Sequence, residues 1–330
     1  MKKQRIFTGD PELRFAIGSV VDGFMFKRAL RLPGGAGNAY EFEHVKSGAH
    51  WLHCETEETK NQFSVAFRTP VEDDCGIPHI LEHMVLAGSK KYPAEDMFDR
   101  LRSGTCIFDA NATTTPEFTN FYFSSVIDSE FFAVADSILD AVFNPRLDDS
   151  VFYREAWRYT STGNRRGALA ITGVVYNEVK ADWRRNWFDH WLFEKLMPGS
   201  SRSHWSGGRP SAILGLSNRD VRNYHQKWYK SANAYVVTQG SIPLENICRF
   251  LDRFFKDYTR QDIKFPDALP MVSQKEFDCE KLEVPKDKFR DAGAGVRPDP
   301  TKGENTKDVK EVASWYVPYS KGSREDRVAR

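Results

Sequence analysis

The stretch GIPHILEHMVLAGSKKYP occupies residues 76–93, and its residue spacing predicts a helix. Between His79 and Leu86, apolar residues recur at the three- and four-residue intervals that one helix face requires. Pro78 suits the first helical turn, where a missing N–H is tolerated, and Gly88 suits the end of the helix. We therefore expect a short helix whose polar residues gather on one side.

Two histidines of this stretch have the spacing of metal ligands. His79 and His83 stand four residues apart, so they lie one turn from each other on the same helix face. Their ring nitrogens can share one Zn²⁺ at about 2.0–2.1 Å. Glu82 directly precedes His83 and points to the same side, which completes the inverted zincin pattern H-x-x-E-H. The spacing alone also allows an ordinary helix that carries two core or surface histidines.

A catalytic zinc site needs a third protein ligand from elsewhere in the fold. Glu178 is the candidate, because it lies in GVVYNEVK (173–180), a second stretch with helical spacing. From spacing alone, Glu178 is one acid among many and is better explained as a solvated helix residue paired with Lys180. Its role as a ligand depends on the resemblance described below. Cys75 precedes His79 by four residues, but a His/His/Glu site needs no thiolate, so we interpret Cys75 as structural.

Strands and helices follow one another without a regular βαβ alternation, which favours an α+β fold. We expect an antiparallel sheet packed with helices, as in a meander with one buried face. Alternating apolar and polar residues, or aromatic and β-branched residues, predict strands at 38–45, 49–55, 63–69, 117–127 and 233–239. Helical spacing predicts helices at 79–86, 93–103, 129–143, 173–196, 218–229 and 243–256.

The composition of the chain changes after about residue 258. Residues 259–310 are rich in Lys, Asp, Pro and Gly and poor in aliphatic residues, so we expect a linker or solvated loop. A strand-like piece, VASWYVPYS, follows at residues 312–320. The sequence therefore predicts a zinc-binding α+β domain over residues 1–258 and the incomplete start of a second, similar domain over 311–330.

Charge and composition exclude several classes of protein. The 47 basic and 46 acidic side chains leave a net charge of +1, which disfavours a nucleic-acid binder that depends on bulk positive charge. No apolar run is long enough to span a bilayer. The five cysteines form no CxxC pair, which is typical of reduced thiols. The basic start lacks the apolar segment of a secretory signal, so we expect a cytoplasmic protein, with a mitochondrion or another organelle as the alternative.

The sequence around the histidines resembles the pitrilysin/insulinase family of inverzincin metallopeptidases, and within it the presequence-protease branch. The resemblance is carried by several segments in the family's order, from about residue 21 to 256. These are VDGFMFKRALRLP (21–33), EHVKSGAHWLH (43–53), FSVAFRTP (63–70), GIPHILEHMVLAGSKKYP (76–93), GVVYNEVK (173–180) and SGGRP (206–210).

The resemblance implies a zinc metalloendopeptidase that hydrolyses unfolded oligopeptides through a zinc-activated water. It assigns Zn²⁺ to His79, His83 and Glu178. It makes Glu82 the general base, which takes a proton from the water and passes it to the leaving amine.

The resemblance also implies where the substrate binds. Asn111, Ala112 and Thr113 correspond to the edge strand on which the family pairs an extended peptide by β-augmentation. The Trp- and Arg-rich residues 181–191 have no such counterpart, and we interpret them as a packed helix with a polar face.

Family members of this branch are much longer, with two similar halves that close into a chamber. The present sequence matches only the first domain and the opening strand of the second. The alternative is therefore a truncated or split half-enzyme. Such a chain would bind zinc but stay inactive until a second chain supplied the C-terminal half.

Overall fold

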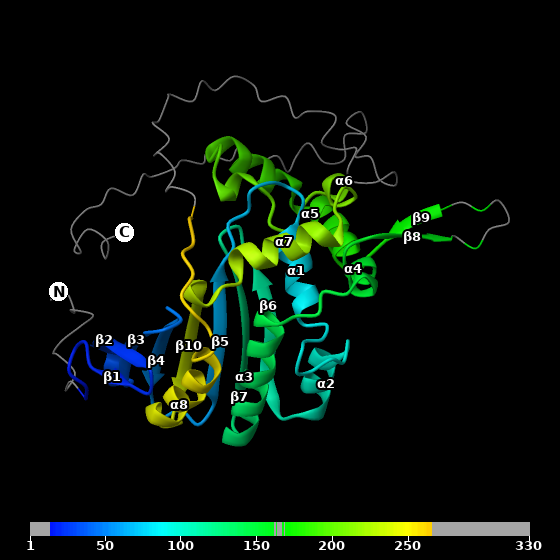
Figure 1. Ribbon diagram of the computed structural model, residues 1–330. Helices are drawn as coiled ribbons and strands as arrows, with labels where there is room; N and C mark the ends of the chain where they lie inside the picture. Colours follow the sequence, from blue (N-terminus) through cyan, green and yellow to red (C-terminus); the bar gives the residue numbers. More distant parts are fainter. Residues whose placement is uncertain (1–13, 162, 164–166, 168, 266–330) are drawn as a thin grey trace.

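The structure, a computed structural model, describes residues 14–161, 163, 167 and 169–265 (Figure 1). Its centre is an eight-stranded sheet with the order β1-β2-β3-β4-β10-β5-β7-β6. The strands are β1 (Val20–Val21), β2 (Phe24–Arg31), β3 (Asn38–His44), β4 (His50–Glu55), β5 (Asn61–Arg68), β6 (Ile107–Thr114), β7 (Phe118–Ser125) and β10 (Ala234–Gly240). A separate two-stranded ribbon consists of β8 (Arg158–Ser161) and β9 (Leu169–Thr172).

The described residues also form eight α-helices. They are α1 (Ile77–Val85), α2 (Met97–Gly104), α3 (Asp128–Phe143), α4 (Asp149–Glu155), α5 (Val174–Leu196), α6 (Pro210–Ile213), α7 (Asn218–Trp228) and α8 (Leu244–Phe255). The α+β class is confirmed, and every strand and helix predicted between residues 38 and 256 lies within a few residues of an observed one.

One strand pair departs from the expected antiparallel sheet. Strand β10 runs antiparallel to β5 but parallel to β4, so it separates two strands that are neighbours in the sequence. The remaining pairs of this sheet are antiparallel. The sheet is therefore mixed, because its middle strand comes from the far end of the described chain.

The core forms where the apolar faces of strands and helices meet. Phe131 of α3 packs edge-on against Phe63 of β5 and lies close to Phe123 of β7. The apolar stripe of α8, which includes Leu251 and Phe255, is fully buried. Burying a large apolar side chain contributes about 1.5–3 kcal/mol relative to leaving it exposed, so these contacts hold α3 and α8 to the sheet.

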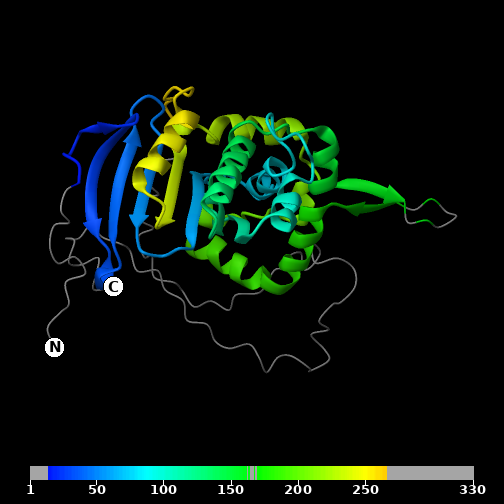
Figure 2. The ribbon, with the colours of Figure 1, turned by 90° about the horizontal axis from the view of Figure 1, so that it is seen from below.

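Several elements were not predicted. The ribbon β8–β9 has mostly exposed residues without clear alternation, and it projects away from the rest of the fold (Figure 1 and Figure 2). Helix α4 was also missed, because its seven residues are too few to show a helical period.

The end of the described chain lies against the fold. Residues 259–265 form no helix or strand, but Ile263 and Phe265 pack against the core, and Phe265 stacks on Trp228. The rest of the predicted linker and the predicted second-domain start at 311–330 lie outside the described residues. Within the described ranges, no helix is long and apolar enough to cross a membrane.

Candidate metal centre and active site

Helix α1 begins where two backbone segments touch. Gly76 precedes the helix with a φ of 75°, a conformation that L side chains rarely adopt. A Cβ atom on Gly76 would lie 2.3 Å from the carbonyl oxygen of Gly207, and one on Gly208 would lie 2.7 Å from the Cα of Gly76. The loop of residues 205–209 therefore presses directly on the start of α1. The glycines of both segments permit this contact.

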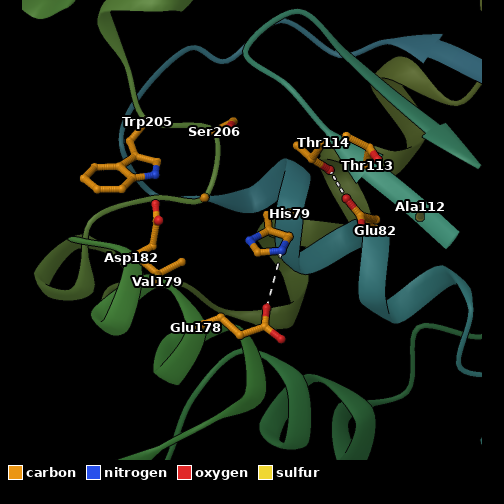
Figure 3. Close-up of a pocket in the computed structure, with 11 residues that line it drawn as sticks. His79, Glu82, Ala112, Thr113, Thr114, Glu178, Val179, Asp182, Trp205 and Ser206 are labelled. Carbon is orange, nitrogen blue, oxygen red and sulfur yellow. Dashed lines mark hydrogen bonds and ion pairs between the residues drawn. The ribbon is translucent and has the colours of Figure 1, made fainter. Parts of the chain in front are cut away.

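The side chains of His79, His83 and Glu178 converge from two helices. The Oε2 atom of Glu178, on α5, lies 3.6 Å from the Nε2 atom of His79 (Figure 3). The same Oε2 atom lies 3.6 Å from the Nε2 atom of His83. Ligand atoms around a tetrahedral Zn²⁺ with bonds of about 2.0–2.1 Å lie about 3.4 Å from one another. The three donors therefore fit a single small divalent cation, and two nitrogens with one carboxylate form a ligand set that zinc accepts.

Glu82 lies beside these donors and is held by a different residue. The ligand atoms of His79, Glu82 and His83 all lie within 4.8 Å of one another. The hydroxyl of Thr114, at the end of β6, donates a short hydrogen bond to Oε2 of Glu82 (Figure 3). Burial raises the pKa of Glu82, and the Thr114 hydrogen bond opposes that shift. A carboxyl group with a raised pKa beside a set of candidate metal donors has the properties of a general base.

The two histidines have different surroundings. Burial, helped by the neighbouring His83, lowers the pKa of His79 to about 4, so His79 is neutral at pH 7. Its buried Nδ1 atom has no hydrogen-bond partner in the described part of the chain. Burial also acts to lower the pKa of His83, but the hydrogen bond to Glu155 and the charge of Glu178 outweigh it, and the net shift is upward.

A cavity of about 300 Å³ opens above these side chains. It is lined by His79, Glu82, Ala112, Thr113, Thr114, Glu178, Val179, Asp182, Trp205, Ser206 and Gly207. Strand β6 is the last strand of the sheet order, and Ala112 and Thr113 bring this edge to the cavity. Asn111 does not line the cavity; its Oδ1 accepts a hydrogen bond from the backbone N–H of Ala112 at 2.9 Å.

The structure adds residues that the sequence did not single out. Glu155 contacts His83, and no spacing rule connects two residues 72 positions apart. Trp205 has no motif of its own; its ring is tilted by 31° against that of Trp183, with ring centroids 4.4 Å apart. Trp183 is almost fully buried, as expected if this helix packs on the fold. Cys75 carries a free thiol whose pKa burial and Asp73 raise to about 11.

Sequence comparison identifies the family of this chain. The profile of Insulinase (Peptidase family M16) matches residues 69–164, which contain α1 and β6. The profile of the Peptidase M16 inactive domain matches residues 215–307, which contain α7, β10 and α8. The chain belongs to the pitrilysin/insulinase family of metallopeptidases, family M16.

Within this family, the chain belongs to the presequence-protease branch. It is 36% identical over 265 residues to the mitochondrial presequence protease of Eremothecium gossypii, which covers 79% of this chain and 26% of the relative. It is 31% identical over 273 residues to the mitochondrial presequence protease of Saccharomyces cerevisiae, which covers 82% of this chain and 27% of the relative. The chain thus spans about a quarter of the length of these relatives.

The fold has a counterpart among solved structures. The match to the crystal structure of pitrilysin covers 70% of this chain and 24% of the pitrilysin chain, with a TM-score of 0.56 and 22% sequence identity. At this identity the match supports the fold, and the roles of individual residues must come from the geometry of the site.

Proposed function

We propose that this chain binds Zn²⁺ through His79, His83 and Glu178 and hydrolyses peptide bonds of unfolded oligopeptides. One observation carries the proposal. The carboxylate of Glu178 is equidistant from the two Nε2 atoms, while Glu82 lines the same cavity without pairing with Glu178. Three donors and one separate base are the parts that a zinc hydrolase needs.

Each residue then has a defined task. Bound Zn²⁺ would lower the pKa of a water molecule and polarise the scissile carbonyl. Glu82 accepts the proton that the attacking water loses and delivers it to the nitrogen of the leaving amine. Thr114 keeps the carboxylate of Glu82 aimed across the cavity through its hydrogen bond. Burial of Glu82 raises its pKa, which makes its carboxylate a stronger base for the first transfer.

The substrate is proposed to pair with the free edge of β6 along Asn111, Ala112 and Thr113. Within the described residues, β6 pairs with β7 alone, so its other edge can accept a further strand. Only an extended segment can pair in this way, which explains a preference for unfolded peptides. Peptides N-methylated at single positions near the scissile bond test the pairing. Loss of cleavage at alternate positions is expected, and equal cleavage of all of them would reject it.

The compartment is proposed by analogy with the relatives. The presequence proteases of Eremothecium gossypii and Saccharomyces cerevisiae are named as mitochondrial proteins. This favours the mitochondrial alternative over the cytoplasmic location expected from composition. Imaging of the tagged chain in its own cell type, beside a mitochondrial marker, decides between them.

The first test combines metal content with peptide cleavage. Purified chain should contain one zinc per molecule by elemental analysis and should cleave a quenched, unstructured peptide. Glu82→Gln should retain the zinc and lose most of the cleavage, because the amide cannot accept the proton. A chain that binds no zinc, or a Glu82→Gln variant with full activity, would refute the proposal.

A second candidate is a half-enzyme that needs a partner chain. The observation that favours it is length, since the chain spans about a quarter of its relatives. This candidate predicts one zinc per chain without cleavage. Adding a separately produced C-terminal portion of a relative should then restore activity that depends on Glu82.

A further inference from the structure

Glu155 is a buried carboxylate that contacts the proposed metal ligand His83 from outside the cavity. It is the last residue of α4, and its side chain is 11% exposed. Its Oε2 atom lies 3.2 Å from the Nδ1 atom of His83, on the side of the ring opposite the Nε2 atom that faces Glu178. One imidazole therefore joins two carboxylates, one on each ring nitrogen.

The position of Glu155 is itself fixed. The Nε atom of Arg154 donates to Oε1 of Glu155 at 2.8 Å, which leaves Oε2 for His83. The Nη1 atom of the same guanidinium pairs with Oε2 of Glu95 at 2.7 Å. Both carboxylate oxygens are thus occupied, Oε1 by the guanidinium of Arg154 and Oε2 by the Nδ1 atom of His83. The carboxylate is thus a pre-placed acceptor for an N–H group on His83.

This arrangement decides which ring nitrogen of His83 can bind a metal. A neutral imidazole carries one N–H, and a carboxylate at Nδ1 holds the hydrogen there. The lone pair then lies on Nε2, which is the atom 3.6 Å from Glu178. His79 has no such support, since its buried Nδ1 has no partner among the described residues. The orientation of the ligand pair therefore depends on His83 and its contact.

We propose that Glu155 is a positioning residue that fixes the ring and tautomer of His83 so that its Nε2 atom is ready to bind the metal. This inference rests on the proposed zinc site. It adds that α4, which contributes no ligand, raises the affinity with which the histidines of α1 bind the metal. Removing such an outer carboxylate costs metal affinity about 10–100-fold in comparable sites.

Two variants of similar length separate the role of Glu155 from simple packing. Glu155→Gln keeps an acceptor oxygen for His83, whereas Glu155→Met fills the space without one. Glu95→Gln is the control, because Glu95 contacts Arg154 but makes no contact with His83 that the structure records. Zinc affinity is measured by competition with a chromophoric chelator, and the d–d spectrum of the Co²⁺-loaded chain reports the ligand geometry.

Glu155→Met should lose about 10–100-fold in zinc affinity and show an altered Co²⁺ spectrum. Glu155→Gln should recover most of the affinity, and Glu95→Gln should stay within about twofold of the original chain. The inference is overturned if Glu155→Met binds zinc within twofold of the original chain, or if Glu155→Gln is no better than Glu155→Met.

A measurement without metal keeps this inference separate from the proposed function. Long-range ¹H–¹⁵N NMR spectra of the metal-free chain at pH 8 report which nitrogen of His83 carries the hydrogen. Nδ1–H is expected in the original chain, and loss of that preference is expected in Glu155→Met. An Nε2–H tautomer in the original chain would overturn the inference. A chain with the Nδ1–H tautomer that binds no zinc would instead refute the proposed function.

Discussion

The hydroxyl of Thr114 donates a hydrogen bond to the carboxylate of Glu82. Thr114 is the last residue of β6, and Glu82 lies in α1, so the bond joins the edge of the sheet to the helix that carries the histidines. The hydrogen bond therefore links β6, on which the substrate is proposed to pair, to Glu82, the proposed general base. A peptide that pairs with β6 would therefore lie next to Glu82, the residue proposed to transfer the proton during cleavage.

Thr114→Val should shift the pH dependence of cleavage. The Thr114 hydrogen bond lowers the pKa of Glu82 against the raising effect of burial, so its loss raises that pKa further. A general base works when deprotonated, so the acidic limb of kcat/KM should move to higher pH by about 0.5–1 unit. Thr160→Val makes the same change on the exposed strand β8 and should leave the limb in place. An unchanged limb in Thr114→Val would show that the bond does not tune Glu82.

Gly76→Ala should destabilise the fold and the site together. The new methyl group would meet the carbonyl oxygen of Gly207 at 2.3 Å, and a left-handed φ adds about 1–3 kcal/mol of strain. The free energy of unfolding should fall by at least ~2 kcal/mol, and the denaturant midpoint should fall with it. Gly104→Ala is the matched control, because a Cβ there meets nothing within 4 Å. If both variants unfold at the same midpoint, the contact between α1 and the 205–209 loop is not tight.

Buried His53 should make the chain less stable in mild acid. Burial lowers the pKa of His53 to about 4, and its Nδ1 atom lies 2.9 Å from the hydroxyl of Thr238. The unfolded chain binds a proton near pH 6.5 and the folded chain does not, so stability falls as the pH drops below 6.5. From pH 7 to pH 5 this group contributes a loss of roughly 2 kcal/mol.

The variant His53→Gln isolates that effect. Its unfolding free energy should fall less between pH 7 and pH 5 than that of the original chain, whatever its stability at pH 7. Urea unfolding of the metal-free proteins at both pH values provides the comparison. Equal losses in the two proteins would mean that folding does not lower the pKa of His53.

Asp74→Ala should destabilise the loop of residues 205–209, which lines part of the cavity. Asp74 accepts a hydrogen bond from the backbone N–H of Trp205 at 2.9 Å, and its other oxygen pairs with Arg209 at 2.8 Å. Removing the carboxylate of Asp74 removes both interactions, which should lower the free energy of unfolding by about 1–3 kcal/mol. Asp99→Ala, on the exposed face of α2, should cost little. Thermal unfolding compares the two, and an equal effect would place the loop's support elsewhere.

The sequence was most informative where interactions are local. Helix α1 and the strands β3, β4, β5, β7 and β10 could be predicted from spacing, and the i, i+4 relation alone brings His79 and His83 together. Glu178 could be chosen only through resemblance, because its approach to both histidines depends on how α5 packs beside α1. The contact between His83 and Glu155 could not be predicted from the sequence, because the two residues are 72 positions apart and Glu155 lies on the short helix α4.

The same limit explains the sheet. The alternation in residues 233–239 predicted a strand but not its neighbours. The strand lies between β4 and β5, with one parallel and one antiparallel side, and it buries side chains such as Val236. Pairing between distant segments carries no local pattern, so the mixed order of the sheet appears only in the structure.

The insertion of β10 also constrains the order of events during synthesis. Strands β1–β4 and β5–β7 can form as two hairpin-rich groups early, but each then presents an open edge where β10 belongs. Those edges cannot be closed until residues 234–240 have left the ribosome. A nascent chain of about 200 residues is therefore exposed to unwanted strand pairing, and a chaperone that shields these two edges would protect it until the sheet is joined.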